Sequence, residues 1–319
     1  MKKKLKLKKK VKNLFVGFIV LLVICIFGVR KYQEYKYKQT NEYKLTEVGY
    51  SLEESKYIVS KLSGNNEKYF VDNDKVDYLV SLLKEKYFME KNLLEYINYR
   101  NDNKKKDLKD IVSIVNVKAN NDWYESDVVS PTDMSKGNLI LVNKFHYLSE
   151  EFVPSDITSV SLSYAYEGQK ATKEVVDAFV DMASSAKDDD IQLLVNSSYR
   201  DYKKQEAIYK DFYYSEGSSY ADKYAARAGY SEHQTGLCLD IFTSGESNTE
   251  NFDETEAFKW LSKNAHKFGF ILRYPKDKEF LTGYEYESWH YRYLGKDIAT
   301  KVYESGLTYD EYYAFYLDK

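Results

Sequence analysis

The first 38 residues carry the feature that most limits what this chain can fold into. Eight lysines lie among the first twelve residues, and an apolar run of 16 residues, 14–29, follows them. Inside a bilayer the backbone must satisfy its own polar groups, so such a run predicts a helix. The run is slightly shorter than the roughly 20 residues that span a membrane, but lysine stems at its ends extend it by snorkelling.

The lysine cluster also predicts how this segment is oriented. Basic residues beside a membrane helix stay in the cytoplasm, so we expect residues 1–38 to form a cytoplasmic head and single-pass anchor, with the rest extracellular. A cleaved signal peptide is the main alternative, but no small-x-small cleavage site follows the apolar core. A lipid-modified Cys25 is disfavoured because Ile24 precedes it, and a buried core helix is disfavoured by the flanking lysines.

The charge of the remaining chain limits its partners. Residues 1–38 hold 12 basic and 1 acidic side chains, whereas the remainder holds 35 basic and 49 acidic ones, a net charge of −14. An acidic domain of this kind is a poor candidate for binding nucleic acid, and we expect no such partner. The 2 cysteines, one of them in the apolar run, exclude a disulfide framework.

Residues 39–136 are interpreted as a stalk and a small helical module. Ser51-Leu52-Glu53-Glu54 resembles a capping box and predicts a helix that ends near Ser63. Two more helices are expected at 74–87 and 90–99. The segment 45–125 contains no histidine and no cysteine, so a scaffold role is the simpler interpretation.

Residues 137–319 are interpreted as a second domain with its own core. Strands and helices mix without a regular βαβ alternation, which favours an α+β fold with a mainly antiparallel sheet flanked by helices. The expected strands are 138–143, 191–196, 237–242, 270–273 and 286–293. The expected helices are 172–185, 201–213, 218–228, 254–268, 297–304 and 309–316.

Two short motifs in this domain carry most of its chemistry. The chain has only 4 histidines, and two of them, His233 and His290, lie in these motifs. In the first, His233 and Asp240 are separated by Gly236, which permits the bend that two ligands of one ion require. Residues 237–242 then alternate as a strand, with Cys238 and Asp240 on one face.

In the second motif, Glu287 precedes His290 by three positions. A metal-dependent peptidase needs a carboxylate near the ion but not bound to it, to take a proton from water and pass it to the leaving amine. Positions three apart point to opposite faces of a flat strand, so we expect a turn or bulge between these two residues. His233, Asp240 and His290 would leave a fourth position open for water.

These motifs, with Ser198-Tyr199-Arg200 and Gln205 upstream, resemble the D-alanyl-D-alanine carboxypeptidase (VanY-type) family of zinc peptidases. That family belongs to the lysostaphin/D-Ala-D-Ala metallopeptidase/hedgehog fold group. The resemblance covers roughly residues 138–305, about half of the chain, and several motifs occur in the family's order. The residues from Gly137 to Lys144 also resemble the lead-in of bacterial members.

The resemblance implies roles for seven side chains. One zinc ion would be bound by His233, Asp240 and His290, and Glu287 would be the general base. Arg200 would steady the oxyanion or pair with the substrate's terminal carboxylate, and Gln205 and Ser231 would also contact substrate. The departure is Cys238, where a smaller residue is usual; we expect it to leave the ligand set unchanged and to affect only the shape of the site's floor.

The sequence thus predicts a membrane-anchored extracellular zinc carboxypeptidase that removes a C-terminal D-alanine from peptidoglycan stem peptides, by D,D- or L,D-cleavage. Nothing in the sequence selects between these cleavages or a dipeptidase activity. The alternative is a zinc-containing wall-binding or signalling module without hydrolysis. The presence of Glu287 favours the enzyme, because a binding module has no need of a general base.

Overall fold

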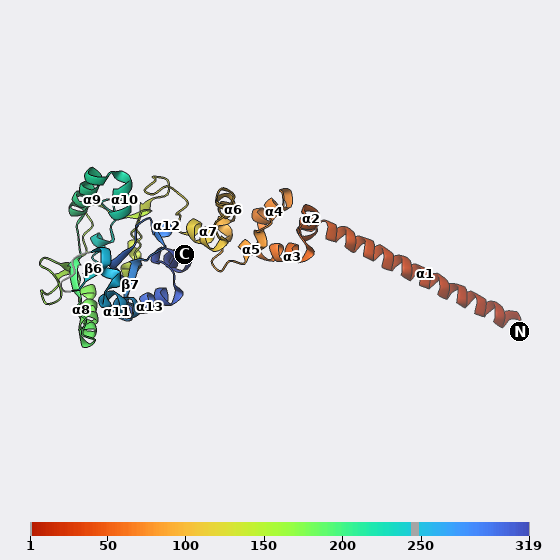
Figure 1. The fold of residues 1–319 in the computed structure, drawn as a ribbon. Helices are drawn as coiled ribbons and strands as arrows, with labels where there is room; N and C mark the ends of the chain where they lie inside the picture. Colours follow the sequence, from red (N-terminus) through yellow and green to blue (C-terminus); the bar gives the residue numbers. More distant parts are fainter. Residues whose placement is uncertain (1, 244–248, 319) are drawn as a thin grey trace. The chain divides into compact units, whose positions relative to one another are not determined.

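The computed structural model describes residues 2–243 and 249–318. The chain divides into two compact units, Met1–Leu94 and Glu95–Lys319. Figure 1 shows a helical N-terminal unit and a C-terminal unit that combines helices with a sheet. The predicted α+β class, with an apolar N-terminal helix before it, is confirmed.

The N-terminal unit begins with the long helix α1 (Lys2–Lys38), which contains the entire apolar run. Its part Lys8–Lys38 is long and apolar enough to cross a membrane. The side chains of the run are exposed, Leu14 by 75% and Ile24 by 60%, so no protein core covers them. The helix is therefore confirmed, and its position in a membrane stays a prediction.

Four shorter helices follow α1: α2 (Asn41–Val48), α3 (Leu52–Lys61), α4 (Gly64–Asp72) and α5 (Leu79–Leu83), before the 3₁₀ turn η1 (Glu90–Asn92). The capping box at α3 is confirmed, because Ser51 N donates to Glu54 Oε2 at 2.7 Å. The helix expected at 74–87 is wrong apart from α5. Helix α3 ends at Lys61, close to the expected stop at Ser63, and α4 begins at Gly64, where the carboxylate of Glu90 accepts a hydrogen bond from Ser63 N at 2.7 Å. That partner lies far along the sequence.

A four-stranded antiparallel sheet forms the centre of the C-terminal unit. Its strands are β5 (Leu194–Ser197), β6 (Cys238–Phe242), β7 (Phe270–Tyr274) and β8 (Glu287–Tyr293), in the spatial order β5-β6-β8-β7. Two small sheets accompany it: β1 (Ser130–Pro131) pairs with β2 (His146–Tyr147), and β3 (Ile157–Ser159) with β4 (Lys170–Thr172). The expected strands at 191–196, 237–242, 270–273 and 286–293 correspond to the central sheet.

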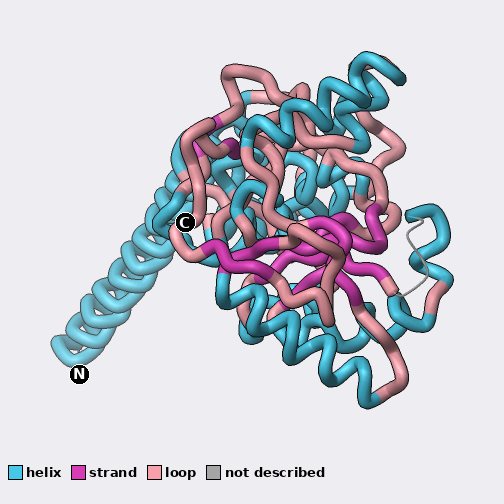
Figure 2. Tube along the Cα trace, turned by 90° about the vertical axis from the view of Figure 1, so that its left-hand side faces the viewer, coloured by secondary structure: helices cyan, strands magenta, loops and turns pink. Residues whose placement is uncertain are grey.

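Helices cover both faces of this sheet (Figures 1 and 2). On one face α8 (Lys173–Asp188) and α11 (Glu256–Asn264) pack with apolar side chains of the strands, including Leu239, Ile241 and Tyr291, to form the main core. On the opposite face lie α9 (Tyr202–Glu216) and α10 (Ser218–Tyr224). The chain ends with α13 (Lys296–Ser305) and α14 (Tyr309–Tyr312), as expected for the tail.

The strand expected at 138–143 is wrong. The chain forms a 3₁₀ segment, η2 (Met134–Leu139), and continues without a strand. The carbonyls of Asn138 and Ile140 accept hydrogen bonds from the buried Arg292 instead of from a neighbouring strand. A side chain about 150 positions away thus takes over the bonding that strand pairing would have supplied.

Residues 95–136 form part of the C-terminal unit. They include most of α6 (Leu93–Asp102) and all of α7 (Leu108–Asn116), whose Ser113 hydroxyl donates to Glu311 at 2.7 Å. Ile114 and Val117 pack against Leu281 of α12 (Glu279–Thr282). This stretch was expected to belong with the preceding helical module, and the division of the chain into 1–38, 39–136 and 137–319 stays a prediction.

Candidate metal centre and active site

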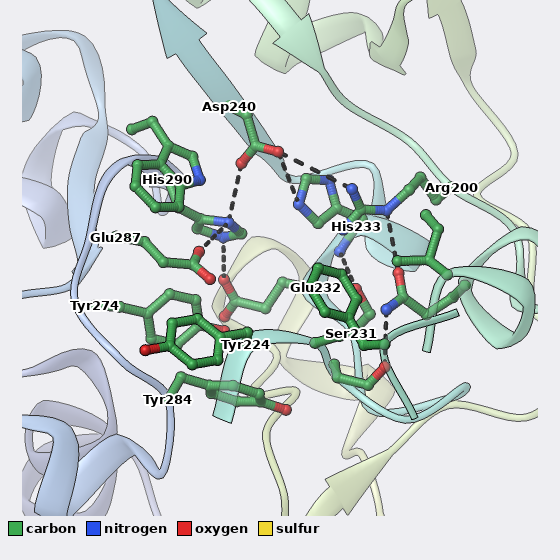
Figure 3. Close-up of a pocket in the computed structure, with 16 residues that line it drawn as sticks. Arg200, Tyr224, Ser231, Glu232, His233, Asp240, Tyr274, Tyr284, Glu287 and His290 are labelled. Carbon is green, nitrogen blue, oxygen red and sulfur yellow. Dashed lines mark hydrogen bonds and ion pairs between the residues drawn. The ribbon is translucent and has the colours of Figure 1, made fainter. Parts of the chain in front are cut away.

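The seven residues proposed from the sequence meet in one pocket on the face of the sheet that α9 and α10 cover. They line a cavity of about 170 Å³ together with apolar and aromatic walls. Figure 3 shows Asp240, His233 and His290 facing one another, with Arg200 and Glu287 on either side. The pocket is lined by Arg200, Gln205, Ser231, His233, Asp240, Glu287 and His290 of the proposed set.

A tight turn places His233 opposite Asp240. His233 lies in the 3₁₀ turn η3 (Glu232–Thr235), which Ser231 caps by accepting a hydrogen bond from His233 N at 3.3 Å. Gly236 ends the turn with φ of 67°, in the left-handed region that favours glycine. A Cβ there would lie 2.7 Å from Cδ1 of Ile157. The predicted bend is therefore present; its positive φ favours glycine, and any larger residue would also force the end of the Ile157 side chain to move.

Strand pairing brings the second histidine to the same place. Asp240 of β6 stands directly opposite His290 of β8, so both side chains lie on the same face of the sheet. On the other side of β8, Tyr291 pairs with Leu272 of β7 and Glu287 pairs with Tyr274. These two pairs are two positions apart on β7 but four positions apart on β8, so β8 contains extra residues between them. This irregularity in β8 is the bulge that we expected between Glu287 and His290, and it turns both side chains toward the pocket.

Each imidazole is anchored through one nitrogen and presents the other to Asp240. His233 Nδ1 lies 2.6 Å from the carbonyl oxygen of Ser198, which can only accept, so Nδ1 carries the proton. The Nε2 atom of His233 then faces Asp240 Oδ2 at 3.5 Å. His290 Nε2 lies 3.4 Å from a Glu232 oxygen, and its Nδ1 lies 3.2 Å from Asp240 Oδ1.

This donor set fits a divalent cation. Two imidazoles and one carboxylate converge in a buried site, where His233 Nε2 and His290 Nδ1 lie at ion-pair distance from the two oxygens of Asp240. Burial alone raises the pKa of Asp240, but the two histidines hold it well below its usual range, so it is a carboxylate. Two histidines and one carboxylate are typical ligands of catalytic zinc, and hydrogen bonds to their outer nitrogens fix the ring orientations.

Glu287 has the properties of a general base. Its Oε2 atom lies 3.4 Å from Nδ1 of His290, and only 17% of its side chain is exposed. Burial raises the pKa of Glu287 to about 7, and Asp240 adds to this while the histidines and Arg200 oppose it. A carboxyl group with a pKa near neutrality can accept a proton and release it again.

Arg200 occupies the opposite side of the pocket. Its Nη1 lies 4.0 Å from Asp240 Oδ2 and donates to the Ser197 hydroxyl, while Nε donates to Gln205 Oε1 at 3.1 Å. Gln205 is buried and its amide donates to the carbonyl of Ala226. In the structure Gln205 therefore positions Arg200, and its proposed contact with substrate stays a prediction.

Two further residues, Cys238 and Glu232, lie close to the ligands. Cys238 is fully buried, and its sulfur lies within 4.8 Å of a ring nitrogen of both His233 and His290. The sulfur lies beside both histidines because β6 points Cys238 and Asp240 to the same face, and its expected effect on the floor of the site stays a prediction. Glu232 was missed, and adjacency to His233 was its only signal in the sequence. The aromatic walls Tyr224, Tyr274 and Tyr284 had none.

Comparison with known proteins places this site in a family. Residues 168–296 match the family model VanY, D-alanyl-D-alanine carboxypeptidase. YodJ of Bacillus subtilis (strain 168), which carries a provisional carboxypeptidase name, is 38% identical over 199 residues, covering 60% of this chain and 73% of YodJ. The solved structure of the LdcB LD-carboxypeptidase, studied for peptidoglycan recognition, is 37% identical with a TM-score of 0.56 and covers 61% of this chain and 94% of LdcB.

A solved vancomycin-resistance D,D-pentapeptidase, a VanY variant from a VanB-type cassette, was determined in complex with Zn(II). It is 35% identical, covers 55% of this chain and 98% of its own, and gives a TM-score of 0.46. The resemblance proposed from the two motifs is confirmed by the family model and by YodJ, and the range that the family model matches, 168–296, includes all seven proposed site residues. The chain belongs to the VanY family of D-alanyl-D-alanine carboxypeptidases.

Proposed function

We propose that this protein is a membrane-anchored extracellular zinc carboxypeptidase that removes the C-terminal D-alanine from peptidoglycan stem peptides. The observation that carries the proposal is the position of Glu287. A buried carboxyl group with a pKa raised to about 7 lies beside a three-ligand metal site and lines an accessible pocket. A module that only binds zinc has no use for such a group.

The chain's own residues supply the remaining parts of the reaction. His233, Asp240 and His290 would hold the zinc ion, which when bound would lower the pKa of a water molecule to about 7 and polarise a carbonyl group. Glu287 accepts the proton of the attacking water and delivers it to the departing amine. The guanidinium of Arg200 lies 4.0 Å from Asp240, beside the proposed metal ligands. From there it can stabilise negative charge on the substrate.

The pocket is suited to the end of a peptide rather than to a long chain segment. It is lined by the charged residues of the site and by the aromatic side chains of Phe212, Tyr224, Tyr284 and Trp289. A terminal carboxylate paired with Arg200 would leave the preceding carbonyl near the ligands. Family relatives act on both D,D- and L,D-peptides, and the walls described here do not select between the two.

The anchor supports a substrate that is part of the cell wall. Helix α1 is long and apolar enough to span a membrane, and its basic end is expected in the cytoplasm. The catalytic unit would then lie on the side of the membrane where peptidoglycan is found. This placement is tested by labelling with a membrane-impermeant reagent in intact cells.

The activity is tested on the full chain in detergent micelles with muropeptides that end in a pentapeptide or a tetrapeptide. We expect release of D-alanine with zinc and none with a chelator, identified by mass spectrometry. Release from only one substrate would establish the cleavage specificity. If zinc is bound one-to-one and neither substrate is cleaved, the protein is a binding module and the proposal is wrong.

A further inference from the structure

The buried carboxylate of Glu232 contacts a metal ligand without facing the pocket's ion position. Glu232 Oε2 lies 3.4 Å from Nε2 of His290, on the side of the ring away from Asp240. Figure 3 shows Glu232 below His290, joined to it by this contact. Since an ionised carboxylate can only accept, the contact keeps the proton on Nε2 and leaves the lone pair of Nδ1 for a metal.

The other oxygen of Glu232 is bound by two arginines. Oε1 accepts from Arg273 Nε and from Arg292 Nη1, each at 2.8 Å, and all three side chains are fully buried. The carboxylate is thus divided: one oxygen faces two guanidinium groups and the other faces His290. Burial raises the pKa of Glu232, but the two arginines lower it further, so the group is ionised.

A second carboxylate, from the C-terminal helix, balances this cluster. Asp310 of α14 pairs with Arg273, with Nη1 to Oδ2 at 2.6 Å and Nη2 to Oδ1 at 3.3 Å. Arg292 uses its remaining Nη2 for the carbonyls of Asn138 and Ile140. Two cations therefore meet two anions, and the share of positive charge that Glu232 experiences depends on Asp310.

We propose that Glu232 is a positioning residue of the metal centre and that Asp310, through Arg273, sets how strongly Glu232 holds His290. This inference rests on the proposed zinc site. When Asp310 is present, the positive charge of Arg273 is shared between two carboxylates. The carboxylate of Glu232 then remains a strong hydrogen-bond acceptor for the imidazole of His290. Without Asp310, Arg273 interacts with Glu232 alone, so Glu232 becomes a weaker acceptor and its hydrogen bond with His290 weakens. The C-terminal helix is then coupled to the metal.

The test measures zinc affinity of the full chain in detergent micelles by competition with a chromophoric chelator. In Glu232→Gln we expect affinity to fall by about 10–100-fold, as is typical for loss of an outer hydrogen-bond partner. Asp310→Asn should weaken binding by a smaller factor. The control is Glu174→Gln. Glu174 of α8 accepts a hydrogen bond from Tyr293, which lies on β8 like His290, but Glu174 has no recorded contact with a proposed metal ligand. Its affinity should equal that of the parent.

Thermal unfolding of each metal-free variant separates positioning from loss of fold. A merely structural role would lower the melting temperature and leave the affinity of the folded fraction unchanged, and that result for Glu232→Gln overturns the inference. If Glu232→Gln does not fold, parental affinity in folded Asp310→Asn overturns it instead. Failure of the parent itself to bind zinc would contradict the proposed function, which is a different outcome.

Discussion

The two histidines face the same carboxylate from opposite sides of the site, but different kinds of partner hold them. On the η3 side, His233 is anchored by the main-chain carbonyl of Ser198 at 2.6 Å. On the β8 side, His290 is anchored by the ionised side chain of Glu232, within a buried cluster of two arginines and two acids. One ligand is thus fixed by neutral backbone and the other by balanced charges.

The difference teaches which side of the site can be altered by substitution. A carbonyl oxygen is present whatever the side chain, so the anchor of His233 depends on the path of the backbone through Gly236 and η3. The anchor of His290 depends on side-chain identity at positions that lie far apart, 232, 273, 292 and 310. The η3 side should therefore respond to changes of conformation, and the β8 side to changes of charge.

The largest effect is expected at the residue that both sides share. In Asp240→Asn the carboxylate between Nε2 of His233 and Nδ1 of His290 becomes a neutral amide, which is a poor zinc ligand. Zinc affinity should fall by more than the factor of about 10–100 expected for an outer partner, and D-alanine release should become undetectable. Equilibrium dialysis and the muropeptide assay measure the two losses, and retained affinity would contradict the ligand assignment.

The next effect separates chemistry from metal binding on the β8 side. Glu287→Gln keeps the shape of the side chain but removes the base, so turnover should fall by about 10²–10⁴-fold, with zinc still bound one-to-one. In the parent, Glu287 must be unprotonated, so turnover should decrease as the pH falls through its pKa. That value is raised to about 7 by burial, and a bound cation lowers it. A variant with parental turnover would show that Glu287 is not the base.

The same contrast explains how much of the site could be predicted from the sequence. The two motifs could be recognised because their residue types and spacing indicate a function locally. The first combines a bend at Gly236 with an alternating strand, so that His233 and Asp240 can approach each other. The second places an acid, Glu287, three positions before a histidine, His290. The fold class followed from strands and helices that are patterned locally. Local signals of this kind are enough to propose the ligands, which the structure then brings together in one pocket.

What could not be predicted depends on buried partners far along the chain. The strand expected at 138–143 failed because Arg292 binds carbonyls of that segment. Glu232 was missed because a glutamate next to a histidine gives no sign that it is fully buried between two arginines. Charge balance among distant side chains has no period and no spacing, so it becomes visible only in the structure.

A conformational change on the η3 side should have a moderate effect on stability. Gly236→Ala forces a residue with a side chain into φ of 67° and places its Cβ 2.7 Å from Ile157 Cδ1. Strain and crowding together should lower the free energy of unfolding by roughly 2–4 kcal/mol. The matched control is Gly168→Ala, where φ is 84° and no atom lies within 4 Å, so only strain applies. Urea unfolding of the metal-free proteins measures both, and equal losses would exclude crowding at Gly236.

The smallest effect is expected for the side chain whose backbone anchors His233. In Ser198→Ala the hydroxyl that accepts from Lys170 N and donates to Gln169 is lost, which should cost about 1 kcal/mol of unfolding free energy. Zinc affinity should remain parental, because the carbonyl that holds His233 Nδ1 is unchanged. Chelator competition beside Glu232→Gln makes the comparison directly. If both variants weaken zinc binding equally, the two histidines are not held by different means, and the charge cluster below His290 has no special role.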